Sequence, residues 1–284
     1  MTGVIDVGGG MRDIYGAGVF DRLLDDGVWF DYCIGVSAGS ANLSSYLARQ
    51  RGRTYRFYTD YSFRREYMSC RNFIRCGSYF DFNYVYDNLA TSHGEDPLDY
   101  RAMTSYEGRY VIVLSDAVTG EAVYADGGSM LQDRYDYIKA SCSIPLVCKP
   151  GEINGRKYYD GGVADPVPLD KAISDGCDRI VLILTRPREY RMALGKEGLA
   201  SKLINRKYPN TARALDMRAE RYNSAVEKAL SLEKEGKCIV IAPDDCCGID
   251  TLTKDREKLH RLYNKGYEDG GRVKAFVKMP ETEL

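Results

Sequence analysis

The chain has 284 residues, enough for one large α/β domain with a sizeable buried core. Lysine and arginine total 40 and aspartate and glutamate total 41, so the net charge of −1 gives no general attraction to nucleic acid. No apolar run approaches the roughly 18 residues of a transmembrane helix, and the N-terminus lacks the basic region of a signal peptide. We therefore expect a cytoplasmic protein whose nine cysteines are free buried thiols.

The first fifty residues predict the start of a parallel sheet covered by helices. Two short apolar runs predict buried strands, and the apolar stripe of Val19, Leu23 and Leu24 predicts a helix that Gly27 ends. The expected elements are, in order, a strand over 4–7, a helix over 14–26, a strand over 32–36 and a helix over 40–49. Strands that alternate with helices in this way are typical of an α/β fold.

The rest of the chain divides into an insertion without clear periodicity and a more regular second half. Residues 51–107 are rich in Tyr, Phe and Arg, and we interpret them as short helices and loops. Beyond them we expect strands over 110–114, 122–125, 157–159, 180–184 and 238–242, and helices over 131–141, 169–175, 212–235 and 254–268. Neither an internal repeat nor a flexible linker occurs, so a single domain over 1–284 is predicted.

The strongest local signal is Gly35-Val36-Ser37-Ala38-Gly39, which has the pattern G-x-S-x-G. It stands between an expected strand and an expected helix, the setting of a nucleophile elbow, where flanking glycines let the chain turn sharply and expose the serine. The N-terminus of the following helix also favours developing negative charge. This context makes Ser37 a candidate nucleophile, although a plain strand-to-helix turn can have the same pattern.

A second signal is the glycine loop Gly8-Gly9-Gly10, followed by Arg12, after the first expected strand. Glycines expose backbone N–H groups and allow close approach, so the loop can bind an oxyanion or a phosphate. The spacing matches neither the P-loop nor the dinucleotide fingerprint. Ser37 lies on the next strand-to-helix turn, so the loop is better interpreted as an oxyanion hole than as a phosphate site or a simple turn. Arg12 would brace the loop or attract an anionic head group.

The third signal is Asp160-Gly161-Gly162 after an expected strand, although an Asp-Gly turn is common on its own. The histidine content narrows the choice of a base. The chain has only His93, in a polar loop, and His260, in the middle of a helix, and both are expected at the surface. A Ser-His-Asp triad is therefore not predicted, which leaves a carboxylate as the partner of the serine. Partial burial would raise the pKa of such a carboxylate from about 3.9 and make it a better base.

Taken together, these motifs resemble the patatin-like phospholipase family. They are GGGMR at 8–12, GVSAG at 35–39, ASCSIP at 140–145 and DGG at 160–162, and they span about residues 5–168. The resemblance implies a three-layer α/β/α patatin-like fold with a mostly parallel central sheet. Its core would cover about 3–170, with a C-terminal helical extension to 284.

The resemblance also implies a catalytic arrangement. Ser37 would attack an ester carbonyl and Asp160 would act as the base of a Ser-Asp dyad, without a metal or cofactor. The oxyanion hole would come from the backbone of Gly8, Gly9 and Gly10, helped by Arg12. One residue departs from the family pattern, because Asp13 stands where many members have glycine. A carboxylate there would weaken an oxyanion hole unless it capped the helix that begins at the next residue.

The function implied is that of a lipid acyl hydrolase of the phospholipase or lysophospholipase type, acting on a lipid or other acyl ester. Two alternatives remain open. An acyltransferase would pass the acyl group to an alcohol instead of water. A non-catalytic lipid-binding protein would keep the fold without the activity; Asp13 favours that alternative, whereas Ser37 and Asp160 oppose it.

The insertion begins with a basic and aromatic stretch. Residues 51–75 contain seven arginines, Arg51, Arg53, Arg56, Arg64, Arg65, Arg71 and Arg75, interleaved with tyrosines and phenylalanines. Such a stretch suits peripheral contact with an anionic membrane, here the inner membrane face. The alternative is a solvated face whose aromatics pack on the sheet. The stretch matches no RNA-binding module, so nucleic acid is not an expected partner.

Overall fold

A computed structural model describes residues 1–195 and 198–278, so the last six residues of the predicted domain lie outside the described part. Eight strands form one sheet in the order β5-β6-β3-β2-β1-β7-β8, and β4 pairs with β3. The strands are β1 (Thr2–Asp6), β2 (Tyr32–Val36), β3 (Arg109–Asp116), β4 (Ala122–Asp126), β5 (Gly151–Ile153), β6 (Arg156–Asp160), β7 (Arg179–Ile183) and β8 (Cys238–Ile241). Strands β3, β2, β1, β7 and β8 run parallel, whereas β4, β5 and β6 are joined by antiparallel pairs.

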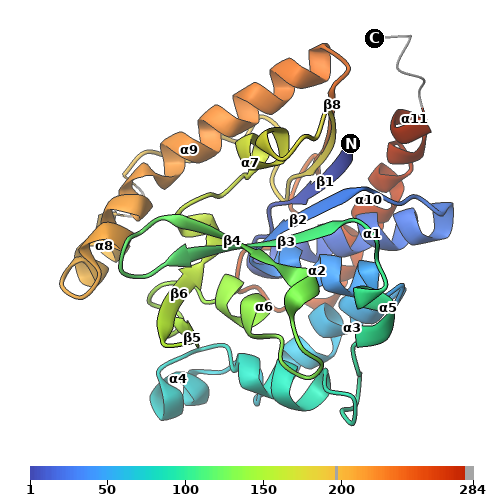
Figure 1. The fold of residues 1–284 in the computed structure, drawn as a ribbon. Helices are drawn as coiled ribbons and strands as arrows, with labels where there is room; N and C mark the ends of the chain where they lie inside the picture. Colours follow the sequence, from blue (N-terminus) through green and yellow to red (C-terminus); the bar gives the residue numbers. More distant parts are fainter. Residues whose placement is uncertain (196–197, 279–284) are drawn as a thin grey trace.

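Helices cover both faces of this sheet, which confirms the predicted α/β/α layers (Figure 1). Helices α1, α2 and α10 lie on one face, and α7 and α9 lie on the other. The α-helices are α1 (Ile14–Asp26), α2 (Ala38–Leu47), α3 (Arg53–Thr59), α4 (Cys70–Cys76), α5 (Tyr100–Thr104), α6 (Asp136–Ser141), α7 (Leu169–Ser174), α8 (Gly198–Asn205), α9 (Pro209–Lys234), α10 (Arg256–Gly270) and α11 (Val273–Lys278). Within the described ranges, no helix is long and apolar enough to cross a membrane.

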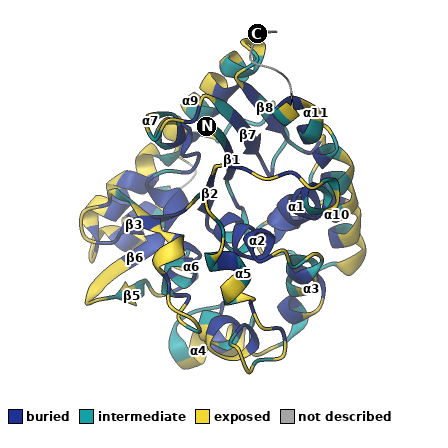
Figure 2. Cartoon of the chain, turned by 45° about the vertical axis from the view of Figure 1, so that its right-hand side comes forward, coloured by how far each residue is buried: buried dark blue, intermediate teal, exposed yellow. Residues whose placement is uncertain are grey.

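The central strands are apolar on both faces because each face is covered by helices. Val4 and Val181 belong to the hydrophobic cluster beneath α1, α2 and α10. Their neighbours Ile5 and Leu182 point the opposite way and belong to the cluster beneath α7 and α9. Figure 2 shows the result, with α1 and α2 largely buried and α4 largely exposed or half-buried.

Several predicted elements differ from those observed. The strand over 32–36 and the helix over 14–26 match to the residue. The helix predicted over 131–141 begins only at Asp136, because a turn with Asp133 at a φ of 63° precedes it. The sequence does not predict β5, α8 or α11, each of which has eight residues or fewer and no clear periodic pattern.

The insertion contains α3, α4 and α5, and its arginines mainly serve the protein itself. Five of the seven pair with carboxylates: Arg51 with Asp25, Arg53 and Arg56 with Asp96, Arg64 with Glu95, and Arg75 with Asp81. Arg65 and Arg71 are exposed, and the tyrosines Tyr58 and Tyr61 are buried. Contact between this stretch and an anionic membrane stays a prediction. Such contact would depend mainly on Arg65 and Arg71, because the other five arginines already pair with carboxylates of the protein.

The strand β3 brings two distant segments together. Val113 of β3 pairs with Val36, the last residue of β2, and the next residue, Leu114, pairs with Asp160, the last residue of β6. Strand β4 pairs with one edge of β3 at both Val113 and Leu114. Strands β2 and β6 therefore both lie along the other edge of β3, where their carboxyl ends face each other. Ser37, which follows β2, is thereby brought beside Asp160.

Candidate active site

Ser37 occupies a sharp turn between β2 and α2. Its backbone has a φ of 55° and a ψ of −128°, a conformation that costs a non-glycine residue on the order of 1–3 kcal/mol. Gly35 and Gly39 are required there, because a β-carbon at either position would lie within 2.6 Å of neighbouring backbone. The turn therefore has the geometry expected of a nucleophile elbow. The Ser37 residue is 7% exposed.

The end of α6 and the loop that follows it hold both sides of the site, a role that the sequence did not reveal. The Ser37 backbone N–H donates to Ser141 Oγ at 2.9 Å, and that hydroxyl donates to the Val113 carbonyl at 2.8 Å. Two residues on, the carbonyl of Ser143 accepts the backbone N–H of Asp160 at 2.9 Å. The only signal in the sequence is that both serines belong to the ASCSIP motif.

Asp160 lies at the end of β6 and is 7% exposed. Burial raises the pKa of its carboxyl, and hydrogen bonding with the Ser37 side chain opposes that rise most strongly. The Gly162 N–H, which donates to Asp160 Oδ1 at 2.8 Å, and the positive charge of Arg218 oppose it further. Burial thus makes Asp160 a stronger base than a solvated aspartate, while its partners keep it ionisable.

The glycine loop packs directly against the elbow. A β-carbon on Gly8, whose φ is 66°, would lie 2.1 Å from the Val36 carbonyl oxygen. The Gly8 N–H donates to Asp6 Oδ1 at 3.0 Å, which differs from the expectation that it serves an oxyanion. Within the described residues, the N–H groups of Gly9 and Gly10 have no protein acceptor. These two donors are the ones available to a ligand.

Arg12 connects the glycine loop to the segment that precedes α10. Its Nη1 donates to Asp250 Oδ1 at 2.6 Å and to Thr251 Oγ1 at 3.0 Å. The Thr251 carbonyl also accepts the Met11 N–H at 3.0 Å, so the segment before α10 holds the loop at two points. Arg12 is 8% exposed, and burial lowers the pKa of its guanidinium, followed by repulsion from Arg186.

Asp13 does not cap α1, which corrects the role considered from the sequence. Its side chain turns to Asp6 beneath the glycine loop, and a β-carbon on Gly16 would lie 2.5 Å from Asp13 Oδ1 and 2.9 Å from Asp6 Oδ2. Both carboxyls are fully buried. Among the described residues, neither Asp13 oxygen receives an N–H or hydroxyl donor. Burial, followed by the charge of Asp6, raises the pKa of Asp13 well above its ordinary value. Burial and the charge of Asp6 thus both favour the protonated form of Asp13, in which its carboxyl can donate to Asp6.

Ser37 lines two cavities, both of which include many apolar side chains. A narrow cavity of about 70 Å³ lies under the insertion, lined mainly by apolar and aromatic side chains that include Phe57, Tyr58, Phe80 and Val85. Arg53, which also lines it, is paired with Asp96. The second cavity, of about 340 Å³, is lined by Ser37, Asp160, the glycine loop and the arginines Arg12, Arg186 and Arg218.

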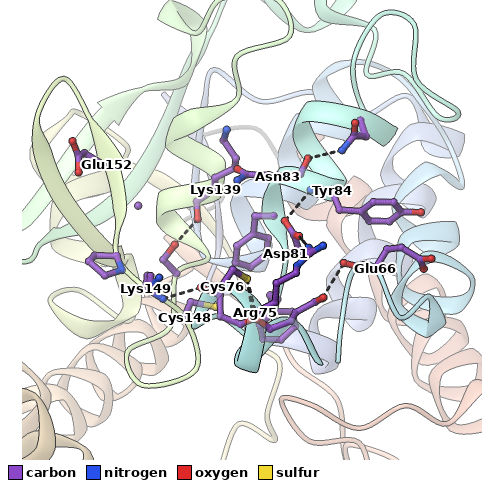
Figure 3. A pocket seen from close by; sticks show the side chains of 18 of the residues that line it. Glu66, Arg75, Cys76, Asp81, Asn83, Tyr84, Lys139, Cys148, Lys149 and Glu152 are labelled. Atoms are coloured by element: carbon purple, nitrogen blue, oxygen red, sulfur yellow. Dashed lines mark hydrogen bonds and ion pairs between the residues drawn. The ribbon is translucent and has the colours of Figure 1, made fainter. Parts of the chain in front are cut away.

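The largest cavity, of about 790 Å³, is not lined by Ser37 or Asp160 (Figure 3). Its lining includes Arg75, which is paired with Asp81, and Lys139, which is paired with Asp136. Because neither Ser37 nor Asp160 lines this cavity, we assign it no part in the chemistry.

The remaining candidates lie away from Ser37. His93 and His260 are exposed, and the His260 ring contacts the Tyr55 hydroxyl and the Asn264 amide at 3.0 and 3.1 Å. The nine cysteines are free, but not all are buried, because Cys70 is exposed and three others are half-buried. In the part of the chain that the structure describes, no cluster of three histidine, cysteine or acidic side chains could hold a metal.

Comparison with known families agrees with this geometry. A family model described as patatin-like phospholipase matches residues 7–173, the segment that contains the elbow, the glycine loop and the DGG turn. A second model, described as a domain of unknown function, DUF6363, matches residues 208–278 and so covers α9 and α10.

Individual relatives match part of the chain. An uncharacterized Escherichia coli protein, YjjU, is 30% identical over 64% of this chain and 51% of its own length. A Mycobacterium tuberculosis protein of the NTE family, Rv1063c, is 28% identical over 39% of this chain and 30% of its own length. This chain thus spans about half or less of these relatives. Among solved structures, VipD from Legionella pneumophila superposes with a TM-score of 0.50 at 12% identity, covering 96% of this chain and 66% of VipD. That likeness concerns the fold alone.

Proposed function

The chain belongs to the patatin-like phospholipase family, and we propose on that basis that it hydrolyses carboxylic esters of lipids through an acyl-Ser37 intermediate. Family membership supports lipid acyl hydrolase activity in general. The observation that supports the specific chemistry is the meeting of Ser37 with the buried Asp160 at one edge of β3. Among the described residues that line the two cavities at Ser37, Asp160 is the carboxylate, and no histidine lines either cavity.

The proposed reaction has two balanced halves. Asp160 accepts the hydroxyl proton of Ser37 as Oγ attacks the ester carbonyl, and the oxyanion binds the N–H groups of Gly9 and Gly10. Collapse breaks the ester C–O bond, and protonated Asp160 gives its proton to the departing alkoxide. Water then attacks the acyl group and passes a proton to Asp160. The second collapse returns that proton to Ser37 and releases the carboxylic acid.

The acyl chain belongs in the cavity under the insertion, because its lining is mainly apolar and aromatic. Its walls come from α3 and from the segment around Phe80 and Val85, so the insertion would determine acyl preference. The non-catalytic alternative loses its motivation, since Asp13 is paired with Asp6 beneath the loop and does not face Ser37 as a free carboxylate.

The test is turnover of short-chain p-nitrophenyl esters and of a panel of lipid esters by wild type and Ser37→Ala. Wild type should release free acid, and the variant should retain the fold without turnover. Transfer of the acyl group to added glycerol in preference to water would favour the acyltransferase alternative. Equal turnover by the two proteins would refute the proposal.

A further inference from the structure

We infer that helix α8 and the residues that flank it form a docking surface for an anionic lipid membrane. The α8 surface consists of three exposed leucines and three exposed cations, which are Leu194, Leu199, Leu203, Lys202, Arg206 and Lys207. The inference goes beyond the proposed hydrolysis, because it concerns where the protein binds and not what it cleaves.

The leucines of the α8 surface are largely exposed to solvent. Leu194, Leu199 and Leu203 are 75%, 73% and 60% exposed. Leu199 and Leu203 stand four residues apart in α8 and therefore share one face of the helix. A single exposed leucine needs no explanation, but neighbouring ones on one face indicate an interaction surface.

The opposite face of α8 is packed against the protein. Ile204 is 4% exposed and belongs to one hydrophobic cluster with Tyr208 and Leu215. Ser201 Oγ donates to the Ala212 carbonyl of α9 at 3.2 Å. These contacts hold α8 with its leucine face outward, at the edge of the molecule beside the start of α9 (Figure 1).

Cations without carboxylate partners accompany the leucines. Lys202, Arg206 and Lys207 are exposed, and none of them pairs with a carboxylate among the described residues. The sequence has no aspartate or glutamate from 198 to 215, so this charge is not balanced locally. A helix with leucines on one face and lysine or arginine beside them is typical of binding in the plane of an anionic membrane.

Charge and position favour a membrane over a second copy of the chain. Two copies related by a twofold axis would bring the cations Lys202 and Arg206 against their own equivalents. A membrane with anionic lipids would neutralise them instead. Ala200, which lies between Leu199 and Leu203 in the sequence, lines the same cavity as Ser37. A membrane on the α8 surface would therefore adjoin that cavity.

The α8 surface lies outside both segments that the family models match. The patatin-like phospholipase model ends at residue 173 and the DUF6363 model begins at residue 208. The six residues of the surface fall between 194 and 207. The inference therefore concerns a part of this chain that neither family model covers.

The test is cosedimentation of the full chain with vesicles of ether-linked lipids, which contain no carboxylic ester to cleave. Wild type should bind vesicles that contain phosphatidylglycerol more tightly than vesicles of phosphatidylcholine alone, and rising salt should weaken that binding. The double variant Leu199→Gln/Leu203→Gln should bind at least about tenfold more weakly, because two apolar side chains no longer leave water. Lys202→Gln/Arg206→Gln should bind the anionic vesicles about thirtyfold more weakly at low salt, from about fivefold for each charge.

Two matched double variants in the insertion supply the control. Phe73 and Ile74 are 48% and 87% exposed, and Arg65 and Arg71 are exposed cations of the same stretch. Phe73→Gln/Ile74→Gln and Arg65→Gln/Arg71→Gln remove the same numbers of apolar and charged groups, and both should bind vesicles as wild type does. All four double variants change exposed side chains, so each should keep the wild-type Tm in differential scanning fluorimetry.

Three results would overturn the inference. The first is a wild type that does not bind anionic vesicles, or that binds them as tightly as both α8 variants do. The second is a loss of binding in the insertion variants as large as the loss in the α8 variants. The third is a dimer in sedimentation equilibrium that Leu199→Gln/Leu203→Gln dissociates, which would assign the surface to a second copy of the chain. Because ether-linked lipids are not cleaved, none of these results depends on hydrolysis at Ser37.

Discussion

Two buried aspartates lie on either side of the elbow, and the same physical effect acts on both. Asp160 is 7% exposed and Asp13 is fully buried, and burial is the largest cause of the raised pKa of each. Their partners differ. Asp160 has the Ser37 side chain, the Gly162 N–H and the charge of Arg218, all of which favour its ionised form. Asp13 faces the carboxyl of Asp6, which favours its protonated form.

The difference shows that burial alone does not assign a role to a carboxyl group. With hydrogen-bond donors and a nearby cation, a buried aspartate can exchange a proton and act as a base. Without such donors burial favours the protonated form, and the group can hold its neighbours in place. Asp13 has this structural role. It contacts Asp6, whose Oδ1 accepts the Gly8 N–H at 3.0 Å and so positions the glycine loop.

The largest expected effect separates the two aspartates by activity. Asp160→Asn should lower kcat/KM on a short-chain p-nitrophenyl ester by about a thousandfold, the scale of losing a general base. Asp13→Asn preserves the shape and a donor towards Asp6, so its loss should stay below about tenfold, within the cost of one hydrogen bond. Steady-state kinetics on both purified variants measure the contrast. Equal losses would mean that Asp13 takes part in the chemistry or that Asp160 does not.

A second prediction concerns the cation beside Asp160. Because Arg218 lowers the pKa of Asp160, Arg218→Gln should move the acid limb of the kcat/KM profile upward by about one pH unit, measured on a neutral ester. The matched control is Arg221→Gln on the same helix, whose guanidinium donates to the Ala164 carbonyl at 2.8 Å. Its acid limb should stay in place. A downward shift in Arg218→Gln, or the same shift in both variants, would contradict the assignment.

The smallest expected effect concerns the stability of the acid pair. The folded protein holds the pKa of Asp6 at about 6 and that of Asp13 well above its ordinary value, so it binds more protons than the unfolded chain above about pH 4. Stability that depends on these protons is therefore present at low pH and declines as the pH rises. The groups facing the pair are Arg12, Tyr58 and Cys142, together with the neutral Asn42.

Asp13→Asn removes the contribution of Asp13 to this proton dependence. The Tm of the variant minus that of wild type should increase by about 3 °C between pH 5 and pH 8, the shift expected for about 1 kcal/mol in a chain of this size. Differential scanning fluorimetry across that pH range measures it. A difference that stays constant, or that falls as the pH rises, would show that Asp13 is not protonated in the folded protein.

Local patterns in the sequence predicted much of this site. A strand followed by G-x-S-x-G identifies a turn whose geometry depends on neighbouring residues, so Ser37 could be named from its local pattern. The DGG turn is common on its own, and Asp160 was named as the base through the resemblance that the four motifs carry together. Helix α1 was predicted to the residue because its apolar stripe and Gly27 are local features as well.

What the sequence could not supply are contacts between distant residues. The pairing of Asp13 with Asp6 depends on how the chain folds back beneath the glycine loop, and Asp13 was instead considered as a helix cap. Arg218 reaches Gly162 from a helix 56 residues further along the chain, and no pattern around either residue signals that contact. Membrane contact was considered for the arginines of the insertion, beside a solvated face with packed aromatics, because composition does not reveal their carboxylate partners.

The central claim is that Ser37 is the nucleophile and that Asp160 activates it. Its most direct test is labelling with a fluorophosphonate, followed by peptide mapping to identify the modified residue. We predict that wild type is labelled at Ser37 alone, that Ser37→Ala is not labelled, and that Asp160→Asn is labelled at least a hundredfold more slowly, consistent with the loss of a general base. Modification of another residue, or labelling of Asp160→Asn at the wild-type rate, would contradict the claim.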